Sequence, residues 1–107
     1  MQPEKNYDLV LSTLLRHGVE FIVVGGVSAV LHGAPYDTFD VDVVHARAAT
    51  NLERLVDALE ELDAVYRMMM SRRLRPPLSA LEGPGHQLLM TRHGPLDVLG
   101  EIGDGMG

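Results

Sequence analysis

Hydrophobic residues near the start of the chain follow first a helical and then a strand pattern. Apolar side chains recur at helical spacing over residues 6–17, and Gly18 stands where a glycine often ends a helix. Residues 20–24 are largely apolar and β-branched, and they stop abruptly at Gly25-Gly26. This pattern predicts a helix followed by a buried strand that enters a tight turn.

Three further elements are predicted in the middle of the chain. A short helix is expected over residues 27–32, where Gly33 ends it, and residues 39–44 favour a strand. A longer helix begins near Thr50 or Asn51, either of which can cap its first turn. One face of this helix is apolar and consists of Leu52, Leu55, Val56, Leu59 and Leu62. The opposite face is acidic and is expected to meet solvent.

The last part of the chain, from residue 68 onwards, lacks a helical pattern of hydrophobic residues. Residues 68–85 lose periodicity and are interrupted by prolines and glycines, which predicts a long irregular connection that is mobile or contains a short helix. Residues 87–91 and 96–99 are apolar segments on either side of residues 92–95 and predict a hairpin. The whole pattern predicts an α/β (α+β) fold in which helices flank a mixed sheet. We expect a single domain over residues 1–107 that is C-terminally truncated, because the chain stops directly after its last strand with nothing to cover the sheet edge.

Composition limits the chemistry of the chain. It has 107 residues, of which 46% are hydrophobic, enough for one core and too few for two ordinary domains. It has no cysteine, which excludes disulfides, zinc–thiolate sites and Fe–S clusters and leaves oxygen or imidazole ligands for a metal. The sequence contains no apolar run of about 18 residues and does not begin like a signal peptide, so we expect a cytoplasmic protein that does not bind membranes.

Charged residues are distributed unevenly. The formal net charge of −6 argues against a general nucleic-acid binder. Four of the nine Lys and Arg residues nevertheless lie close together and form an arginine cluster, Arg67, Arg72, Arg73 and Arg75. This arginine cluster is either a solvated basic loop or a surface that meets a triphosphate or an RNA end.

The histidines do not suggest a metal site. His17, His45, His86 and His93 lack metal-ligand spacing with one another. We expect them at solvated or capping positions.

Asp40 and Asp42 are the most informative residues in the sequence. They alternate with apolar residues in the predicted strand 39–44, so they share one face and lie about 6.6 Å apart at a rise of ~3.3 Å per residue. Two carboxylates on one face repel each other unless a cation joins them. Such a face can bind one or two Mg²⁺ ions, which recur in enzymes that move phosphoryl and nucleotidyl groups. We therefore expect Mg²⁺ or Mn²⁺ as the cofactor and phosphate chemistry as the function.

Other residues complete this candidate site. The Gly25-Gly26 turn lets the backbone approach a phosphate, and the Ser28 hydroxyl and the N–H groups of the following helix can bind phosphate oxygens. Asp97, in the second strand of the hairpin, would hold a metal and accept the proton of an attacking hydroxyl. The candidate catalytic and metal-binding residues are therefore Asp40, Asp42 and Asp97, and the candidate phosphate-binding residues are Gly25, Gly26 and Ser28.

In order and spacing, this set resembles the nucleotidyltransferase superfamily that includes DNA polymerase β, and within it the minimal nucleotidyltransferases of bacterial toxin–antitoxin systems. The family pattern begins with an apolar residue, a glycine, and then a glycine or serine. After a spacer it continues with Asp-apolar-Asp-apolar. This chain matches it with Val24-Gly25-Gly26, thirteen intervening residues and Asp40-Val41-Asp42-Val43. Segments 31–35 and 94–99 are similar to one bacterial subgroup. The resemblance covers roughly residues 7–102 and implies a nucleotidyltransferase-like fold. It also implies transfer of NMP from an NTP, ATP first, to a protein or tRNA hydroxyl, with release of pyrophosphate.

Two alternative functions stay open beside this one. The same fold can act as an antitoxin-like module that binds a helical toxin partner through the acidic helix face and Met68-Met69-Met70. It can also be a degenerate domain that binds a nucleotide without transferring it. The sequence does not choose between a protein and a tRNA as the acceptor.

Overall fold

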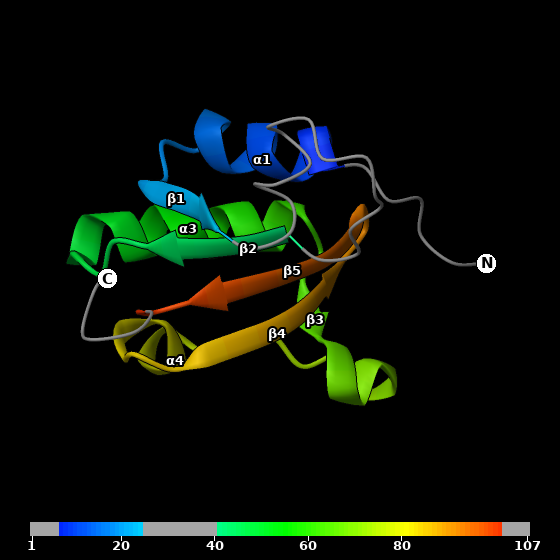
Figure 1. Cartoon of the computed structure of the whole chain (residues 1–107). Coiled ribbons are helices and arrows are strands. Elements are labelled where there is room, and N and C mark those ends of the chain that lie inside the picture. The colour runs from blue at the N-terminus through cyan, green and yellow to red at the C-terminus, as the bar shows by residue number, and fades with distance from the viewer. Residues whose placement is uncertain (1–6, 25–40, 102–107) are drawn as a thin grey trace.

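Two parts of the chain, residues 7–24 and 41–101, are described by the computed structural model. They form one mixed five-stranded sheet with helices packed on it (Figure 1). The strands are β1 (Phe21–Val24), β2 (Val41–His45), β3 (Val65–Tyr66), β4 (His86–Thr91) and β5 (Gly94–Leu99). The helices are α1 (Tyr7–Arg16), α3 (Ala49–Glu61), the 3₁₀ segment η1 (Arg67–Arg72) and α4 (Leu78–Glu82). The predicted α/β class with a mixed sheet is confirmed for this part of the chain.

The strand order in the sheet is β1-β2-β5-β4-β3. β2 and β5 run parallel, whereas the other neighbouring pairs in this sheet are antiparallel. β4 and β5 form the predicted hairpin, with a tighter turn than residues 92–95, since Gly94 and Pro95 already pair within β5. Parallel strands need a long crossover, and here the chain passes through α3, β3, α4 and β4 between β2 and β5.

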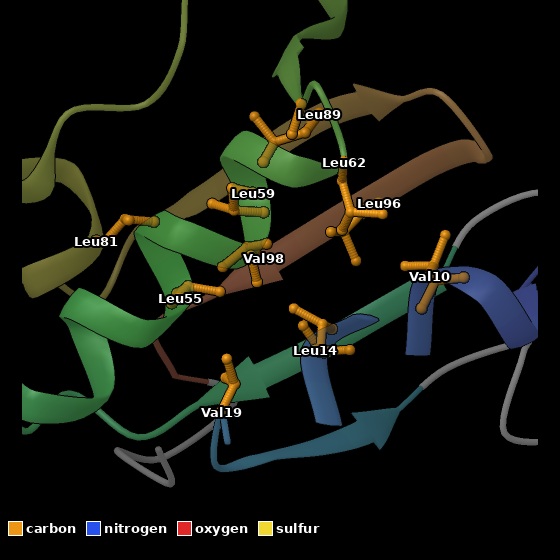
Figure 2. Close-up of a cluster of buried hydrophobic side chains, with 14 of the residues drawn as sticks. Val10, Leu14, Val19, Leu55, Leu59, Leu62, Leu81, Leu89, Leu96 and Val98 are labelled. Atoms are coloured by element: carbon orange, nitrogen blue, oxygen red, sulfur yellow. The ribbon is translucent and has the colours of Figure 1, made fainter. Parts of the chain in front are cut away.

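One face of the sheet bears the hydrophobic core (Figure 2). α1 and α3 lie across this face, and their apolar residues meet alternate residues of β2 and β5. The side chains of a strand alternate between faces, so the residues between these core positions point to the opposite face of the sheet. The fully buried core leucines are Leu14, Leu55, Leu62, Leu81, Leu89 and Leu96.

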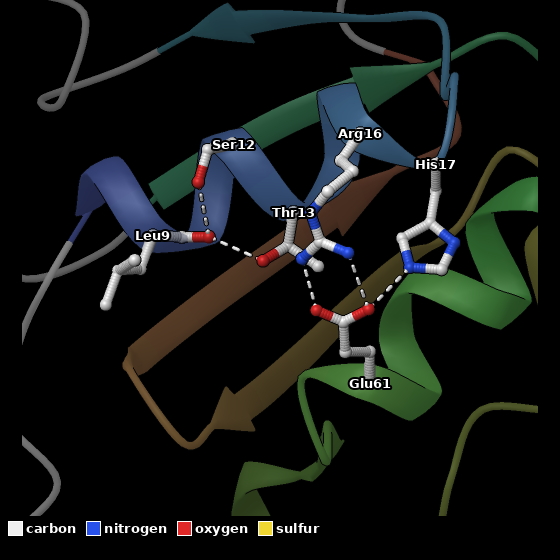
Figure 3. Close-up of polar contacts among 6 residues, drawn as sticks. All are labelled: Leu9, Ser12, Thr13, Arg16, His17 and Glu61. Atoms are coloured by element: carbon white, nitrogen blue, oxygen red, sulfur yellow. Dashed lines mark hydrogen bonds and ion pairs between the residues drawn. The ribbon is translucent and has the colours of Figure 1, made fainter.

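Polar contacts also join α1 to the end of α3 (Figure 3). The guanidinium of Arg16 donates two hydrogen bonds to the carboxylate of Glu61, and His17 Nε2 lies 2.9 Å from Glu61 Oε1. The bonds from Arg16, and then the one from His17, lower the pKa of Glu61 to about 2. Because these groups are exposed, solvent screens the contact, and α1 is held in place mainly by its apolar face.

α1 ends at a glycine, as predicted. Gly18 has a φ of 75°, a left-handed conformation that residues with a Cβ rarely adopt. Its N–H donates to the Leu15 carbonyl at 2.9 Å, and the N–H of Val19 donates to the Leu14 carbonyl at 3.0 Å. This cap turns the chain from α1 towards β1.

The start of α3 differs from the prediction. Ala48 occupies the N-cap position without a side-chain cap, so neither Thr50 nor Asn51 caps the helix. Asn51 is buried instead: its Oδ1 accepts the N–H of Glu20 at 2.6 Å, and its Nδ2 donates to the carbonyls of Glu20 and Ala46 at 3.1 and 2.7 Å. Asn51 therefore ties the first turn of α3 to the chain just before β1 and just after β2.

The segment predicted to be irregular has more structure than expected. It holds most of η1 and all of α4, and it is preceded by the short strand β3, which was not predicted because two residues are too few to show a period. The helix predicted over residues 27–32 lies outside the described residues. Among the helices of residues 7–24 and 41–101, none has the length and apolar character needed to cross a membrane.

Two adjacent leucines of α1 test the assignment of the core. Leu14 is 0% exposed and Leu15 is 65% exposed. Leu14→Ala leaves a cavity in the core and should lower the free energy of unfolding by about 2–5 kcal/mol, whereas Leu15→Ala should change it by about 0.5 kcal/mol or less. Urea unfolding of both variants measures the difference, and equal destabilisation would show that α1 does not pack through Leu14.

Candidate functional site

Asp42 and Asp97 lie side by side on the face of the sheet opposite the helices. β2 and β5 pair in a parallel register that places Asp42 beside Asp97. Adjacent strands are about 4.8 Å apart, so the two side chains leave the sheet as neighbours. The residues flanking each aspartate in its strand are buried in the core, which directs both carboxylates to the other face. The structure thus brings together two of the three predicted acidic residues, and we call them the acidic pair.

The surroundings of the acidic pair hold little water. Asp97 is 9% exposed and Asp42 is half-buried. Val44 and Leu99, the next residues on the same face, are also buried and also lie side by side. Burial disfavours a charged carboxylate, and a second carboxylate beside it adds repulsion. This part of the sheet therefore favours the binding of a positive charge.

Arg67 supplies a positive charge to the acidic pair. Its Nη1 lies 3.1 Å from Asp97 Oδ1, and the two side chains are 25% and 13% exposed. The ion pair connects η1, which follows β3 and contacts both β3 and β4, to the central strand β5. Arg67 belongs to the arginine cluster seen in the sequence, but its pairing with Asp97 was not predicted, because the two residues are far apart along the chain.

Two other arginines of the cluster are bound to one carboxylate. Arg73 and Arg75 both donate to Asp63, the latter at 2.7 Å. The hydrogen bond from Arg73, followed by the one from Arg75, lowers the pKa of Asp63. Arg75 also donates to the Ala64 carbonyl at 3.1 Å. Three of the four members of the arginine cluster therefore bind carboxylates, and Arg72, Arg73 and Arg75 are also exposed to solvent.

The remaining predicted site residues, Gly25, Gly26, Ser28 and Asp40, lie outside the described residues. Within the described ranges, no three His, Asp or Glu side chains gather into a metal-binding group. The acidic pair nevertheless fits a hard cation, because it presents two carboxylates, the donors that Mg²⁺ and Mn²⁺ prefer, from neighbouring strands of a rigid sheet.

A small cavity on the helix side of the sheet is not part of this site. It has a volume of about 100 Å³ and is lined by Val56, Leu59, Glu60, Arg75 and Pro76. Pockets for drug-sized ligands measure about 300–1,000 Å³. The cavity is too small for a nucleotide, and α3, which lines it, covers the face opposite the acidic pair.

His45 is a correction to the sequence analysis, which expected it at a solvated or capping position. It is 1% exposed, at the end of β2, and its Nε2 lies 2.9 Å from the Leu81 carbonyl in α4. Burial lowers the pKa of His45, the charge of Arg47 lowers it further, and the carbonyls of Leu81 and Leu99 oppose the shift. His45 is therefore a neutral structural residue that attaches α4 to the sheet.

Comparison with known protein families, curated proteins and solved structures found no significant match. The interpretation of the site therefore depends on its own geometry and on the residue pattern in the sequence.

The lowered pKa of His45 predicts a loss of stability in mild acid. The unfolded chain takes up a proton near the ordinary pKa of about 6.5, whereas folded His45 does so only at lower pH. Its contribution is complete above pH ~6.5 and is lost as the pH falls towards the folded pKa, with a slope of up to about 1.4 kcal/mol per pH unit. His45→Gln, which keeps a donor for Leu81, should remove this slope.

Urea unfolding of the wild type and of His45→Gln at several pH values between about 7 and 5.5 measures the effect. The other histidines are present in both proteins, so the difference between the two curves isolates His45. Parallel curves would show that folded His45 titrates as it does in the unfolded chain.

Proposed function

We propose that this chain is a metal-dependent nucleotidyltransferase that moves NMP from an NTP, with ATP as the first candidate, to a hydroxyl of a protein or a tRNA. The acceptor oxygen forms a bond to the α-phosphorus, the bond from that phosphorus to the bridging oxygen breaks, and pyrophosphate leaves with the electron pair. The fold would be the nucleotidyltransferase fold of the DNA polymerase β superfamily, in the minimal form found in toxin–antitoxin systems.

The register of the acidic pair supports this proposal most directly. Asp42 and Asp97 come from distant parts of the chain, and only the pairing of β2 with β5 makes them neighbours. Two carboxylates beside each other on a poorly hydrated face oppose folding of the metal-free protein. An apolar residue at either position would suit the sheet better, so binding of a cation explains their position better than folding does.

Each predicted residue has a role in this proposal. Asp42 and Asp97, together with Asp40, would hold Mg²⁺ or Mn²⁺. When bound, the metal would neutralise the triphosphate and favour ionisation of the attacking hydroxyl. Asp97 would accept the proton of that hydroxyl. Gly25, Gly26 and Ser28 would bind the phosphate oxygens and set the direction of attack.

An antitoxin-like or degenerate nucleotide-binding module is the second candidate function. Three consecutive methionines of η1, Met68, Met69 and Met70, are 83%, 45% and 40% exposed. Exposed methionines occur on surfaces that adapt to a protein partner. In that case the domain would act by binding a toxin or a nucleotide, and no pyrophosphate would be released.

Asp42→Asn should abolish NMP transfer and metal-dependent nucleotide binding. An NTP with Mg²⁺ at ~100 times its Kd should stabilise the wild type by about 2.7 kcal/mol, which raises the Tm by several degrees. The variant should lose this increase, because it lacks one of the carboxylates that hold the metal. Thermal unfolding with ATP, CTP, GTP and UTP, each with and without Mg²⁺ or Mn²⁺, measures binding, and transfer of label from an α-phosphate-labelled NTP measures activity.

Asp57→Asn is the matched control, since Asp57 is exposed on α3, on the other side of the sheet. It should behave like the wild type in both assays. A nucleotide-induced rise in Tm without pyrophosphate release would favour the degenerate module. Transfer by Asp42→Asn at the wild-type rate would refute the assignment of the acidic pair as metal ligands.

A further inference from the structure

Arg67, the first residue of η1, forms an ion pair with Asp97 of the acidic pair. Its guanidinium lies 3.1 Å from Asp97 Oδ1, and both side chains are partly shielded from solvent. In the proposed function this carboxylate binds a divalent cation. A cation bound through the same oxygen would stand within a few ångströms of the guanidinium, and like charges at that distance repel strongly where little water screens them.

The charges favour the metal in this competition. A divalent cation has twice the charge of a guanidinium and can contact both Asp42 and Asp97, which lie in register. Arg67 can leave Asp97 because its side chain is 25% exposed and can return to water.

The structure of η1, the segment that contains Arg67, is compatible with movement of Arg67 away from Asp97. η1 runs from Arg67 to Arg72, has no buried residue and is interrupted at Met69, whose φ and ψ of −136° and 51° are not helical. A segment with few buried contacts opens at low cost in free energy.

The base of η1, in contrast, is firmly attached. The N–H of Tyr66 donates to the Leu74 carbonyl at 2.8 Å, which closes the loop at its base. Arg73 and Arg75 bind Asp63 just before β3. Displacement of Arg67 can therefore move the exposed residues 67–72 without disturbing the sheet.

We propose that Arg67 is a built-in counter-ion of Asp97 that a divalent cation must displace, so that metal binding at the acidic pair and movement of η1 are coupled. This proposal rests on the proposed function, because it requires the acidic pair to bind a metal. Arg67 is a positioning residue in this scheme. It neutralises Asp97 in the metal-free protein, and it makes the affinity for free metal lower than two carboxylates would otherwise give.

Titration of the nucleotide-free protein with Mn²⁺, followed by electron paramagnetic resonance, tests the competition. Arg67→Gln should bind Mn²⁺ about tenfold more tightly than the wild type, because the metal no longer has to displace a guanidinium from Asp97. Arg67→Lys keeps the charge and should stay within about threefold of the wild type. Arg72→Gln removes the same charge from the same exposed segment, at a residue outside the ion pair with Asp97, and should change the affinity by about twofold or less at physiological salt.

Amide hydrogen exchange tests the coupling to η1. Mn²⁺ should speed exchange of residues 67–72 in the wild type and should have no such effect in Arg67→Gln, where no ion pair has to break. If Arg67→Gln does not fold without metal, the exchange experiment on the wild type decides the question by itself.

The outcomes separate this proposal from the proposed function. If the wild type, Arg67→Gln and Arg72→Gln bind Mn²⁺ equally and exchange of residues 67–72 does not respond, the counter-ion role of Arg67 is wrong and the metal site stands. If neither the wild type nor Arg67→Gln binds Mn²⁺, both proposals fail. Binding that appears only after Arg67→Gln supports the counter-ion role in its strongest form.

Discussion

The parallel pairing of β2 with β5 is the constraint on which both the fold and the candidate site depend. It joins two parts of the chain that no local turn connects, and it fixes Asp42 beside Asp97. A shift of the register by one residue would turn every side chain of β2 to the other face and would place Asp42 in the core. Because α1 and α3 cover that face with apolar residues, such a shift would be costly. The packing of the core therefore keeps the two carboxylates together.

This pairing also creates an electrostatic conflict between two acidic side chains. Two acidic residues meet on a face where Val44 and Leu99 are buried, so water does little to separate their charges. The contact with Arg67 relieves part of this conflict through an ion pair between η1 and β5. The ion pair thus places one positive charge beside the two carboxylates.

Local sequence patterns predicted the elements whose signals lie within a few neighbouring residues. The helical period and Gly18 predicted α1, the apolar stripe predicted α3, and two apolar segments predicted the hairpin of β4 and β5. The alternation with apolar residues predicted that Asp40 and Asp42 share one face, and the structure shows that Asp42 lies on the face opposite the core. Asp40, Gly25, Gly26 and Ser28 lie outside the described residues and stay predictions.

The interactions that sequence analysis missed are long-range ones. Asn51 looked like a helix cap because it stands before an apolar stripe, and its bonds to Glu20 and Ala46 depend on how β1 and β2 end. His45 looked like a surface residue because nothing near it in sequence shows that α4 covers it. The arginine cluster was visible, but which carboxylate each arginine binds depends on the position of β3 at the sheet edge.

The two faces of the sheet have different physical requirements, and this explains how the fold can hold a charged site at all. The helix face supplies the apolar burial that stabilises the fold, through residues that alternate with Asp42 and Asp97 along the same two strands. The charged face adds Val44 and Leu99 to that burial, whereas η1, which carries Arg67, has no buried residue. Charge on this face can therefore change, by loss of an arginine or gain of a metal, while the core that positions the carboxylates stays intact. The packed core on one face therefore holds Asp42 and Asp97 in fixed positions on the other.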